Sequence, residues 1–458
     1  MKDKMLAPRN TLLKASLFVF ILLVIIIGGI GIMPRVKSIL SAASLMKLTA
    51  RDAAAGDNFG FSVSVSGDTA VVGAFHKDNG KGEVYVFTRS GSTWSQQGTL
   101  TAVDAAAGDY FGTTVSISGD TAVVGASYKD NFKGAAYVFT RSGSTWSQQA
   151  KLTAVDAAAN DYFGYSVSAS GDMVVVGAYL KDTNKGAAYV FVRSGSTWSQ
   201  QARLNSSDPA ANDYFGYSVS GSGDTVVVGA YLKDSARGAA YIFTRSGSAW
   251  SQQARLTPSD AVAGDNFGRS VSIIGDTVVV GAYGKDGGKG AAYVFTRSGS
   301  AWSQQAKLIA ADAAAGDYFG FSVSLSDNKA VVGAYLKDSF KGAAYVFTRS
   351  GSVWSQQAKL TVGDSAVNDY FGYSVSVSGD KVAVGAPYKL SLKGAAYVRN
   401  LLPPNQLYKW LFLIIGTLIV AVAVIVIILK KKKHAPSIAS KKGAALPPSA
   451  GSETKRID

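Results

Sequence analysis

The stretch Asp161–Leu204, DYFGYSVSASGDMVVVGAYLKDTNKGAAYVFVRSGSTWSQQARL, recurs in close copies through most of this chain. Its Phe-Gly pair returns every 52 residues without an insertion, at Phe59, Phe111, Phe163, Phe215, Phe267, Phe319 and Phe371. A fixed period in this range is typical of stacked supersecondary units, none of which can bury its apolar face alone.

Each repeat contains four short runs with the character of β-strands. Phe163–Ser170 alternates larger residues with glycine and serine, as a half-buried strand does. Val174–Ala178 is a continuous apolar run, which predicts a strand covered on both faces. Ala187–Phe191 is rich in residues that suit a pleated surface, and Trp198–Leu204 would be the outermost strand. Four antiparallel strands in about 50 residues predict one blade of a β-propeller.

The two ends of the array predict a closed ring. The seventh repeat stops at Val398 and lacks the tryptophan strand that the other six carry, with the tryptophans at Trp94, Trp146, Trp198, Trp250, Trp302 and Trp354. Met46–Ala50 matches that strand, and its pairing with the last blade would remove two open, aggregation-prone edges. A β-solenoid is the alternative, but its coils are usually shorter and need end caps. We therefore predict an all-β protein, a seven-bladed propeller of four-stranded antiparallel blades over residues 45–398, closed by an N-terminal strand.

The repeat also resembles a known family. Phe371-Gly372 followed by Gly385-Ala386-Pro387 is a literal FG…GAP pair, and the other copies keep FG…VGA. This is similar to the FG-GAP repeat, the blade of the integrin α-subunit head. The resemblance implies an extracellular propeller that serves adhesion or ligand binding, although a fold does not fix a function.

The sequence departs from the calcium-binding blades of that family. Those blades carry a D-x-D-x-D-G loop, whereas the corresponding connection here is only Ser118-Gly119-Asp120 and its copies. Such a turn offers too few oxygen ligands to surround Ca²⁺. We expect no metal and no cofactor.

Two uncharged apolar segments flank the predicted propeller, at residues 15–33 and 410–429. Both are long enough to cross a lipid bilayer. Each has its heavier basic flank on the side away from the propeller, so the positive-inside rule predicts two transmembrane helices, cytoplasmic termini and an extracytoplasmic propeller at the cell surface. Segment 15–33 could instead be a cleaved signal peptide, which would leave the orientation of the propeller unchanged.

The remaining segments are short. Residues 1–14 form a basic cytoplasmic N-terminus, 34–44 and 399–409 are linkers, and 430–458 has the composition of a disordered basic tail. The net charge of +15 divides into +6 for residues 1–47, +8 for 399–458 and only +1 for the propeller. A nucleic-acid partner therefore has no electrostatic support.

Closure of the ring separates two faces. The Arg-Ser-Gly-Ser and Ser-Gly-Asp turns lie on the same face of the propeller, here called the turn face. Both linkers connect to the propeller on this face, so we expect it to be directed toward the membrane. The opposite loop face bears the loops between second and third strands and the loops between blades. It carries an aromatic rim that we select as the candidate site for an extracellular protein or glycan: Phe75, Tyr128, Tyr179, Tyr231, Tyr283, Tyr335 and Tyr388. The alternative is that these rings pack beneath their own loops.

Catalysis has little support in this composition. The chain has two histidines and no cysteine, so Ser-His-Asp and Cys-His sites lack a base or a nucleophile. The aspartates that recur once per blade are interpreted as loop caps, at Asp109, Asp161, Asp213, Asp265, Asp317 and Asp369. We therefore expect no enzyme and no catalytic residue. The favoured hypothesis is a membrane-anchored cell-surface binding or adhesion module; the alternatives are a structural component of a cell envelope and, less favoured, a membrane-anchored enzyme.

Overall fold

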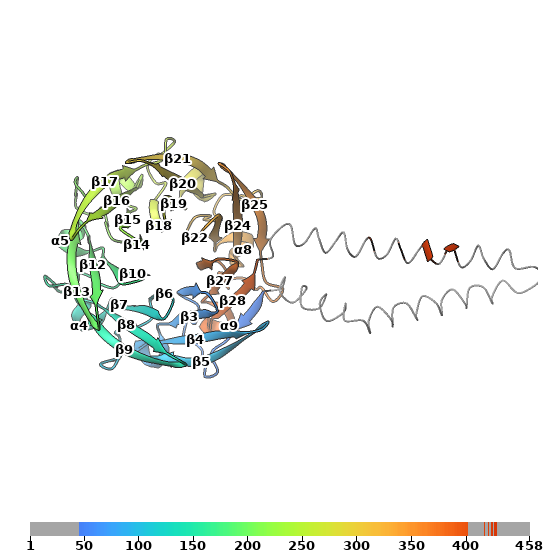
Figure 1. Cartoon of the computed structure of the whole chain (residues 1–458), viewed down its shortest axis with the longest axis horizontal. Helices are drawn as coiled ribbons and strands as arrows, with labels where there is room; N and C mark the ends of the chain where they lie inside the picture. Colours follow the sequence, from blue (N-terminus) through green and yellow to red (C-terminus); the bar gives the residue numbers. More distant parts are fainter. Residues whose placement is uncertain (1–44, 402–415, 417–419, 421–422, 425, 428–458) are drawn as a thin grey trace, which may run out of the picture. The chain divides into compact units, whose positions relative to one another are not determined.

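The computed structural model describes residues 45–401 together with 416, 420, 423, 424, 426 and 427. Residues 45–401 form seven four-stranded antiparallel sheets arranged as the blades of a propeller (Figure 1). The innermost strands are β2 (Val63–Ser66), β6 (Thr114–Ser118), β10 (Ser166–Ser170), β14 (Ser218–Ser222), β18 (Phe267–Ile274), β22 (Ser322–Ser326) and β26 (Ser374–Ser378). The second strands are β3 (Thr69–Ala74), β7 (Thr121–Ala126), β11 (Met173–Ala178), β15 (Thr225–Ala230), β19 (Thr277–Ala282), β23 (Lys329–Ala334) and β27 (Lys381–Ala386).

The third strands are β4 (Glu83–Ser90), β8 (Ala135–Ser142), β12 (Ala187–Ser194), β16 (Ala239–Ser246), β20 (Ala291–Ser298), β24 (Ala343–Ser350) and β28 (Ala395–Asn400). The outer strands are β5 (Thr93–Leu100), β9 (Thr145–Leu152), β13 (Thr197–Leu204), β17 (Ala249–Leu256), β21 (Ala301–Leu308), β25 (Val353–Leu360) and β1 (Met46–Leu48). The predicted closure is confirmed, because β1 pairs antiparallel with β28 and places Leu48 opposite Ala396.

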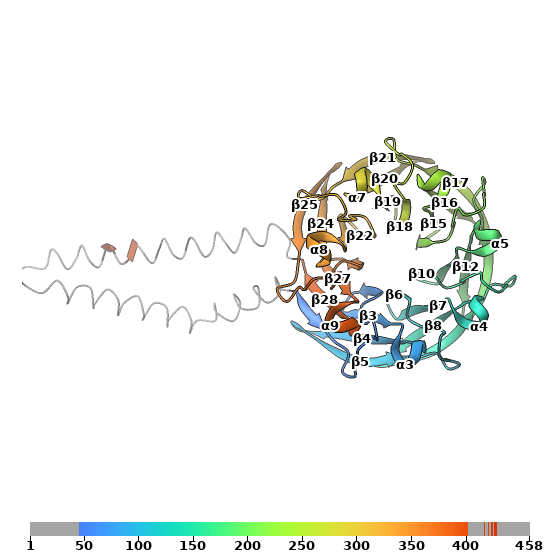
Figure 2. The same ribbon diagram turned by 180° about the vertical axis from the view of Figure 1, so that it is seen from behind.

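Single helical turns interrupt the loops between second and third strands. They are α3 (Lys77–Gly80), α4 (Lys129–Phe132), α5 (Lys181–Asn184), α6 (Lys233–Ala236), α7 (Lys285–Gly288), α8 (Lys337–Phe340) and α9 (Lys389–Leu392), and Figure 2 shows α3, α7, α8 and α9 on the near face. Each includes residues in the left-handed region, such as Asp182 with φ 52°. Four residues are too few to produce a helical periodicity, so the sequence predicted only a loop between the second and third strands.

The Phe-Gly segment differs from the prediction in six of the seven blades, whereas in the fifth blade β18 begins at Phe267 as expected. A strand was expected from Phe163, but β10 begins at Ser166, because Tyr162 and Gly164 adopt φ values of 56° and 91° and turn the chain. The Phe-Gly segment instead fastens neighbouring blades: Phe215 forms an isolated parallel bridge with Gly186 of the preceding blade. A Cβ on Gly186 would lie 1.9 Å from the Phe215 carbonyl oxygen, so the approach requires glycine.

The hydrophobic core lies between the blades rather than within one sheet. One cluster joins Val123 and Leu152 of the second blade to Phe163, Val176 and Tyr189 of the third, all of them buried. Phe163 meets the ring of Tyr189 edge-on at a centroid distance of 5.5 Å. Every blade therefore depends on its neighbour for burial, which explains why the array needs closure.

The turn face repeats a second set of contacts. Arg193 Nε donates to Asp172 Oδ1 at 2.7 Å, and its guanidinium lies over Trp198 at 5.9 Å. Trp198 Nε1 donates to Gln149 Oε1 of the preceding blade at 3.0 Å. The arginine of the turn is therefore held by an ion pair and a cation–π contact, and the tryptophan beneath it links the outer strands of adjacent blades.

The predicted membrane segments fall largely outside this description. Residues 15–33 lie entirely outside the described residues, as do 1–14, 34–44 and 430–458. Within 410–429 only the six residues named above are described, and they are helical. No helix in the described part of the chain is long and apolar enough to cross a membrane.

Candidate binding face

The loop face is held in place by a buried ion pair that recurs in the blades. In the third blade, Lys181 Nζ lies 2.9 Å from Asp161 Oδ2, and both side chains are less than a tenth exposed. Asp161 also accepts a hydrogen bond from the backbone N–H of Ala158 at 2.7 Å, which confirms the predicted loop cap. Tyr189 Oη donates to Asp156 at the foot of the same loop at 2.8 Å. These contacts fix the loops that present the rim.

The structure places all seven predicted rim residues, Phe75, Tyr128, Tyr179, Tyr231, Tyr283, Tyr335 and Tyr388, partly buried on the loop face. Among the described residues no two of these seven rings contact each other directly. They are bridged by the tyrosines that precede Phe-Gly in five blades, Tyr110, Tyr162, Tyr214, Tyr318 and Tyr370. These twelve residues are called the aromatic band.

The aromatic band has two gaps. Asn266 and Asn58 occupy the bridging position of the fifth and first blades, so no ring joins Tyr231 to Tyr283 or Tyr388 to Phe75. Burial raises the pKa of Tyr335 to about 12 and also raises that of Tyr283, so these two hydroxyl groups stay neutral at physiological pH. The band is thus an uncharged, partly apolar surface.

Sequence reasoning missed a second ring closer to the axis. The residue that follows Phe-Gly in each blade points toward the centre, and the seven positions form what we call the collar: Phe61, Thr113, Tyr165, Tyr217, Arg269, Phe321 and Tyr373. Tyr165 contacts Tyr217 at a centroid distance of 4.8 Å, and Phe321 contacts Tyr373 at 5.2 Å. The available signal was the aromatic residue at this position in five of seven repeats.

The collar surrounds a hollow of about 410 Å³ on the propeller axis. Its walls below the collar are the serine, threonine and valine side chains that begin the innermost strands. Phe75 and Tyr128 of the aromatic band also line it, so the predicted rim and the hollow form one continuous surface.

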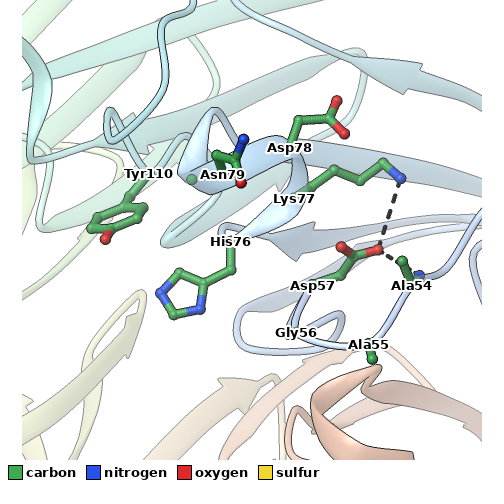
Figure 3. Close-up of a pocket in the computed structure, with 10 residues that line it drawn as sticks. Ala54, Ala55, Gly56, Asp57, His76, Lys77, Asp78, Asn79 and Tyr110 are labelled. Carbon is green, nitrogen blue, oxygen red and sulfur yellow. Dashed lines mark hydrogen bonds and ion pairs between the residues drawn. The ribbon is translucent and has the colours of Figure 1, made fainter.

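A separate hollow of about 530 Å³ lies beside α3 (Figure 3). His76 lines it, and partial burial lowers the pKa of this imidazole, so it is neutral at physiological pH. Lys77 points instead toward Asp57, with 3.8 Å between Nζ and Oδ2, and Asp57 accepts the N–H of Ala54 at 2.8 Å. Lys77 Nζ also lies 3.0 Å from Asp52 Oδ2, so the ammonium is paired, whereas Asp78, which lines the hollow too, forms no ion pair among the described residues.

Exposed apolar side chains gather on the loop face. Ten large apolar residues of the propeller are exposed, and nine of them lie on loop-face segments: Val103, Phe132, Val155, Val262, Ile309, Phe340, Val367, Leu390 and Leu392. Only Val353 lies on the turn face. Val103 and Val155 are the most exposed of them, at 86% and 87%.

The fold and its blade signature define the class of protein. The family model of the FG-GAP repeat matches seven segments, at residues 44–87, 94–139, 146–191, 198–243, 250–295, 302–347 and 354–399. The chain belongs to the FG-GAP repeat family. No curated protein matches the sequence. Among solved structures, a chain from "Crystal Structure of Mitotic Checkpoint Complex" is 14% identical with a TM-score of 0.52, and the alignment covers 79% of this chain and 96% of that one. At that identity the likeness shows the fold alone.

Proposed function

We propose that this protein is a non-catalytic binding module whose ligand contacts the loop face. The observation that carries the proposal is the placement of nine of the ten exposed large apolar side chains of the propeller on that face. A surface of this kind, next to a band of partly exposed aromatic rings, is suited to contact with a partner. The opposite face bears turns whose charges are paired, as in Arg193 with Asp172.

We further propose that the ligand is an extracellular protein or glycan and that the chain acts in adhesion at the cell surface. Support comes from the uncharged segments 15–33 and 410–429 and their basic flanks, which favour a membrane anchor with the propeller outside. The non-catalytic assignment is supported by the buried aspartates of the loop face, such as Asp109, Asp161 and Asp213, which form ion pairs that repeat around the ring.

The test is binding of the full chain, purified in detergent, to a panel of glycans, matrix proteins and whole cells. A Tyr231→Ala, Tyr283→Ala double variant should bind more weakly, as should Val103→Ser combined with Val155→Ser. The two valines are 86% and 87% exposed, so their replacement should not affect folding. Val353→Ser on the turn face, 66% exposed, is the matched control.

The outcomes separate the hypotheses. Saturable binding that both loop-face variants weaken and Val353→Ser leaves unchanged would support the proposal, and we expect it to resist a calcium chelator. Loss of binding in Val353→Ser alone would refute the choice of face. Absence of binding together with regular arrays on cells would favour the structural role, which the near-identity of the outer strands also suggests.

A further inference from the structure

The collar contains one residue that does not belong to its pattern. Where other blades place an aromatic side chain or threonine, the fifth blade places Arg269. The guanidinium carbon lies 4.6 Å from the ring centroid of Tyr217 and 4.1 Å from that of Phe321, so the cation sits between the two neighbouring collar rings. Cation–π contacts of this kind stabilise the guanidinium through its two flat faces.

The edge of the guanidinium is left without a partner. Among the described residues, no carboxylate forms an ion pair with Arg269 and no acceptor takes a hydrogen bond from its side chain. The residues that line the hollow include no Asp or Glu. Arginine keeps its charge at any physiological pH and carries five N–H donors in one plane. The hollow therefore holds an uncompensated positive charge with free donors.

The tyrosines nearby do not neutralise this charge. Burial raises the pKa of Tyr165 and of Tyr373 well above the usual range, so both phenols stay protonated. Tyr165 Oη already hydrogen-bonds Tyr217 Oη at 2.8 Å. A partly buried charge without a counter-charge is costly, and an oxyanion that accepts two parallel N–H bonds is the group that best offsets the cost.

Room for such a group lies across the ring. Thr113 is the only small side chain among the collar residues, and it stands three blades from Arg269, as far apart as a ring of seven allows. The collar therefore leaves most room on the side opposite the blade that carries Arg269. Entry is from the loop face, where Phe75 and Tyr128 continue the lining of the hollow.

The hollow does not suit an extended peptide. A peptide usually binds by adding a strand to a free sheet edge. Here the N–H groups along the inner strands are capped by serines of the preceding blade, as Ser116 Oγ caps Ala169 N at 3.0 Å and Ser64 Oγ caps Ile117 N at 3.1 Å. What remains accessible is a set of flat aromatic faces and hydroxyls around one cation. Such a surface matches a pyranose ring that carries an acidic group.

We propose that the central hollow binds an acidic sugar residue, with its carboxylate on Arg269 and its ring against the aromatic collar. The inference deepens the proposed function and rests on it for its biological role, because it assigns the chemistry of the ligand at the same face. The binding site itself is defined by the collar alone.

The experiment is isothermal titration calorimetry on the full chain in detergent with sodium glucuronate, using glucose as the neutral counterpart and sodium sulfate and an aspartate-rich peptide as competing anions. Arg269→Tyr places in the fifth blade the residue that the third, fourth and seventh blades carry, so it should fold. Arg237→Gln removes one positive charge from an exposed position on the same face and is the matched control.

We expect saturable glucuronate binding, none with glucose, a loss of roughly 10- to 100-fold in affinity for Arg269→Tyr, and no change for Arg237→Gln. Arg269→Lys, which keeps the charge but loses the planar fork, should fall between wild type and Arg269→Tyr. No glucuronate binding, or equal binding by Arg269→Tyr, would overturn the proposal. Sulfate or peptide that binds as tightly as glucuronate would overturn the sugar assignment. If glucuronate binds while the adhesion panel stays negative, the site stands and the proposed function fails.

Discussion

Replacement of Lys181 by methionine should destabilise the propeller strongly although no apolar contact is lost. The Lys181 ammonium lies 2.9 Å from the Asp161 carboxylate, and the two side chains are 5% and 8% exposed. Its removal leaves a buried carboxylate with one backbone donor, the N–H of Ala158. Breaking a buried pair from one side typically costs about 3–5 kcal/mol, because the remaining charge is uncompensated. We expect a loss in that range.

The assay is equilibrium denaturation of the full chain in urea, followed by circular dichroism. Lys185→Met is the matched control, since this lysine is exposed on the same loop, and its effect should stay within about 0.5 kcal/mol. The double variant Lys181→Met, Asp161→Asn removes both charges and should be more stable than Lys181→Met alone by at least about 1 kcal/mol. The reasoning is refuted if Lys181→Met matches its control, or if the second substitution adds to the loss.

Three further predictions concern the ring. Gly186→Ala should destabilise by more than about 2 kcal/mol in the same urea assay, because its Cβ would lie 1.9 Å from the Phe215 oxygen at a φ of 85°; a neutral result would contradict the close approach. Partial burial opposes ionisation of Asp104, but hydrogen bonds led by Lys151 outweigh it and lower the pKa from 3.8 to about 2. At a pH between these two pKa values the unfolded chain binds more protons than the folded chain, so the melting temperature should fall as the pH drops from about 4 to 2. A melting temperature that stays constant or rises over this range would contradict the prediction. Leu48→Lys should unfasten β1 from β28 and produce aggregates in size-exclusion chromatography, whereas a monodisperse profile would show that closure does not depend on this strand.

The architecture could be predicted because its signals are local and repeated. The 52-residue period and the four strand-like runs predicted the blades, which are confirmed by the seven four-stranded sheets. The displaced strand at Met46–Ala50 predicted the closure, which is confirmed by the pairing of β1 with β28. The Asp caps were also predictable, since an aspartate followed by Tyr-Phe-Gly or Asn-Phe-Gly marks a turn. These features depend only on residues within a single repeat or on the two ends of the repeat array.

Of the candidate site, the sequence predicted the aromatic rim but not the collar, because the collar depends on contacts between different repeats. The rim residues were selected from the variation after Gly-Ala, but the collar arises from contacts such as Tyr165 with Tyr217, 52 positions apart. An alternation pattern assigned Tyr165 to a strand and could not show that the left-handed backbone at Tyr162 redirects it toward the axis. Departures in backbone conformation of this kind leave no periodic signal, so the hollow became visible only in three dimensions.

Small sequence differences between the blades make the surface around the propeller axis chemically asymmetric. Because the seven blades are nearly identical, the ring is close to symmetric. It is asymmetric only at the few positions where one blade has a different residue from the others. The fifth blade shares its gap in the aromatic band, at Asn266, with Asn58 of the first blade, but it alone places a charged residue, Arg269, in the collar. A purely structural repeat has no reason to place an unpaired cation at the one point that all seven blades share, because that charge costs stability. This loss of stability is explained if Arg269 binds an anionic ligand. The Arg269→Tyr variant tests the explanation, because its free energy of unfolding should be higher than that of the wild type while its affinity for the ligand is lower.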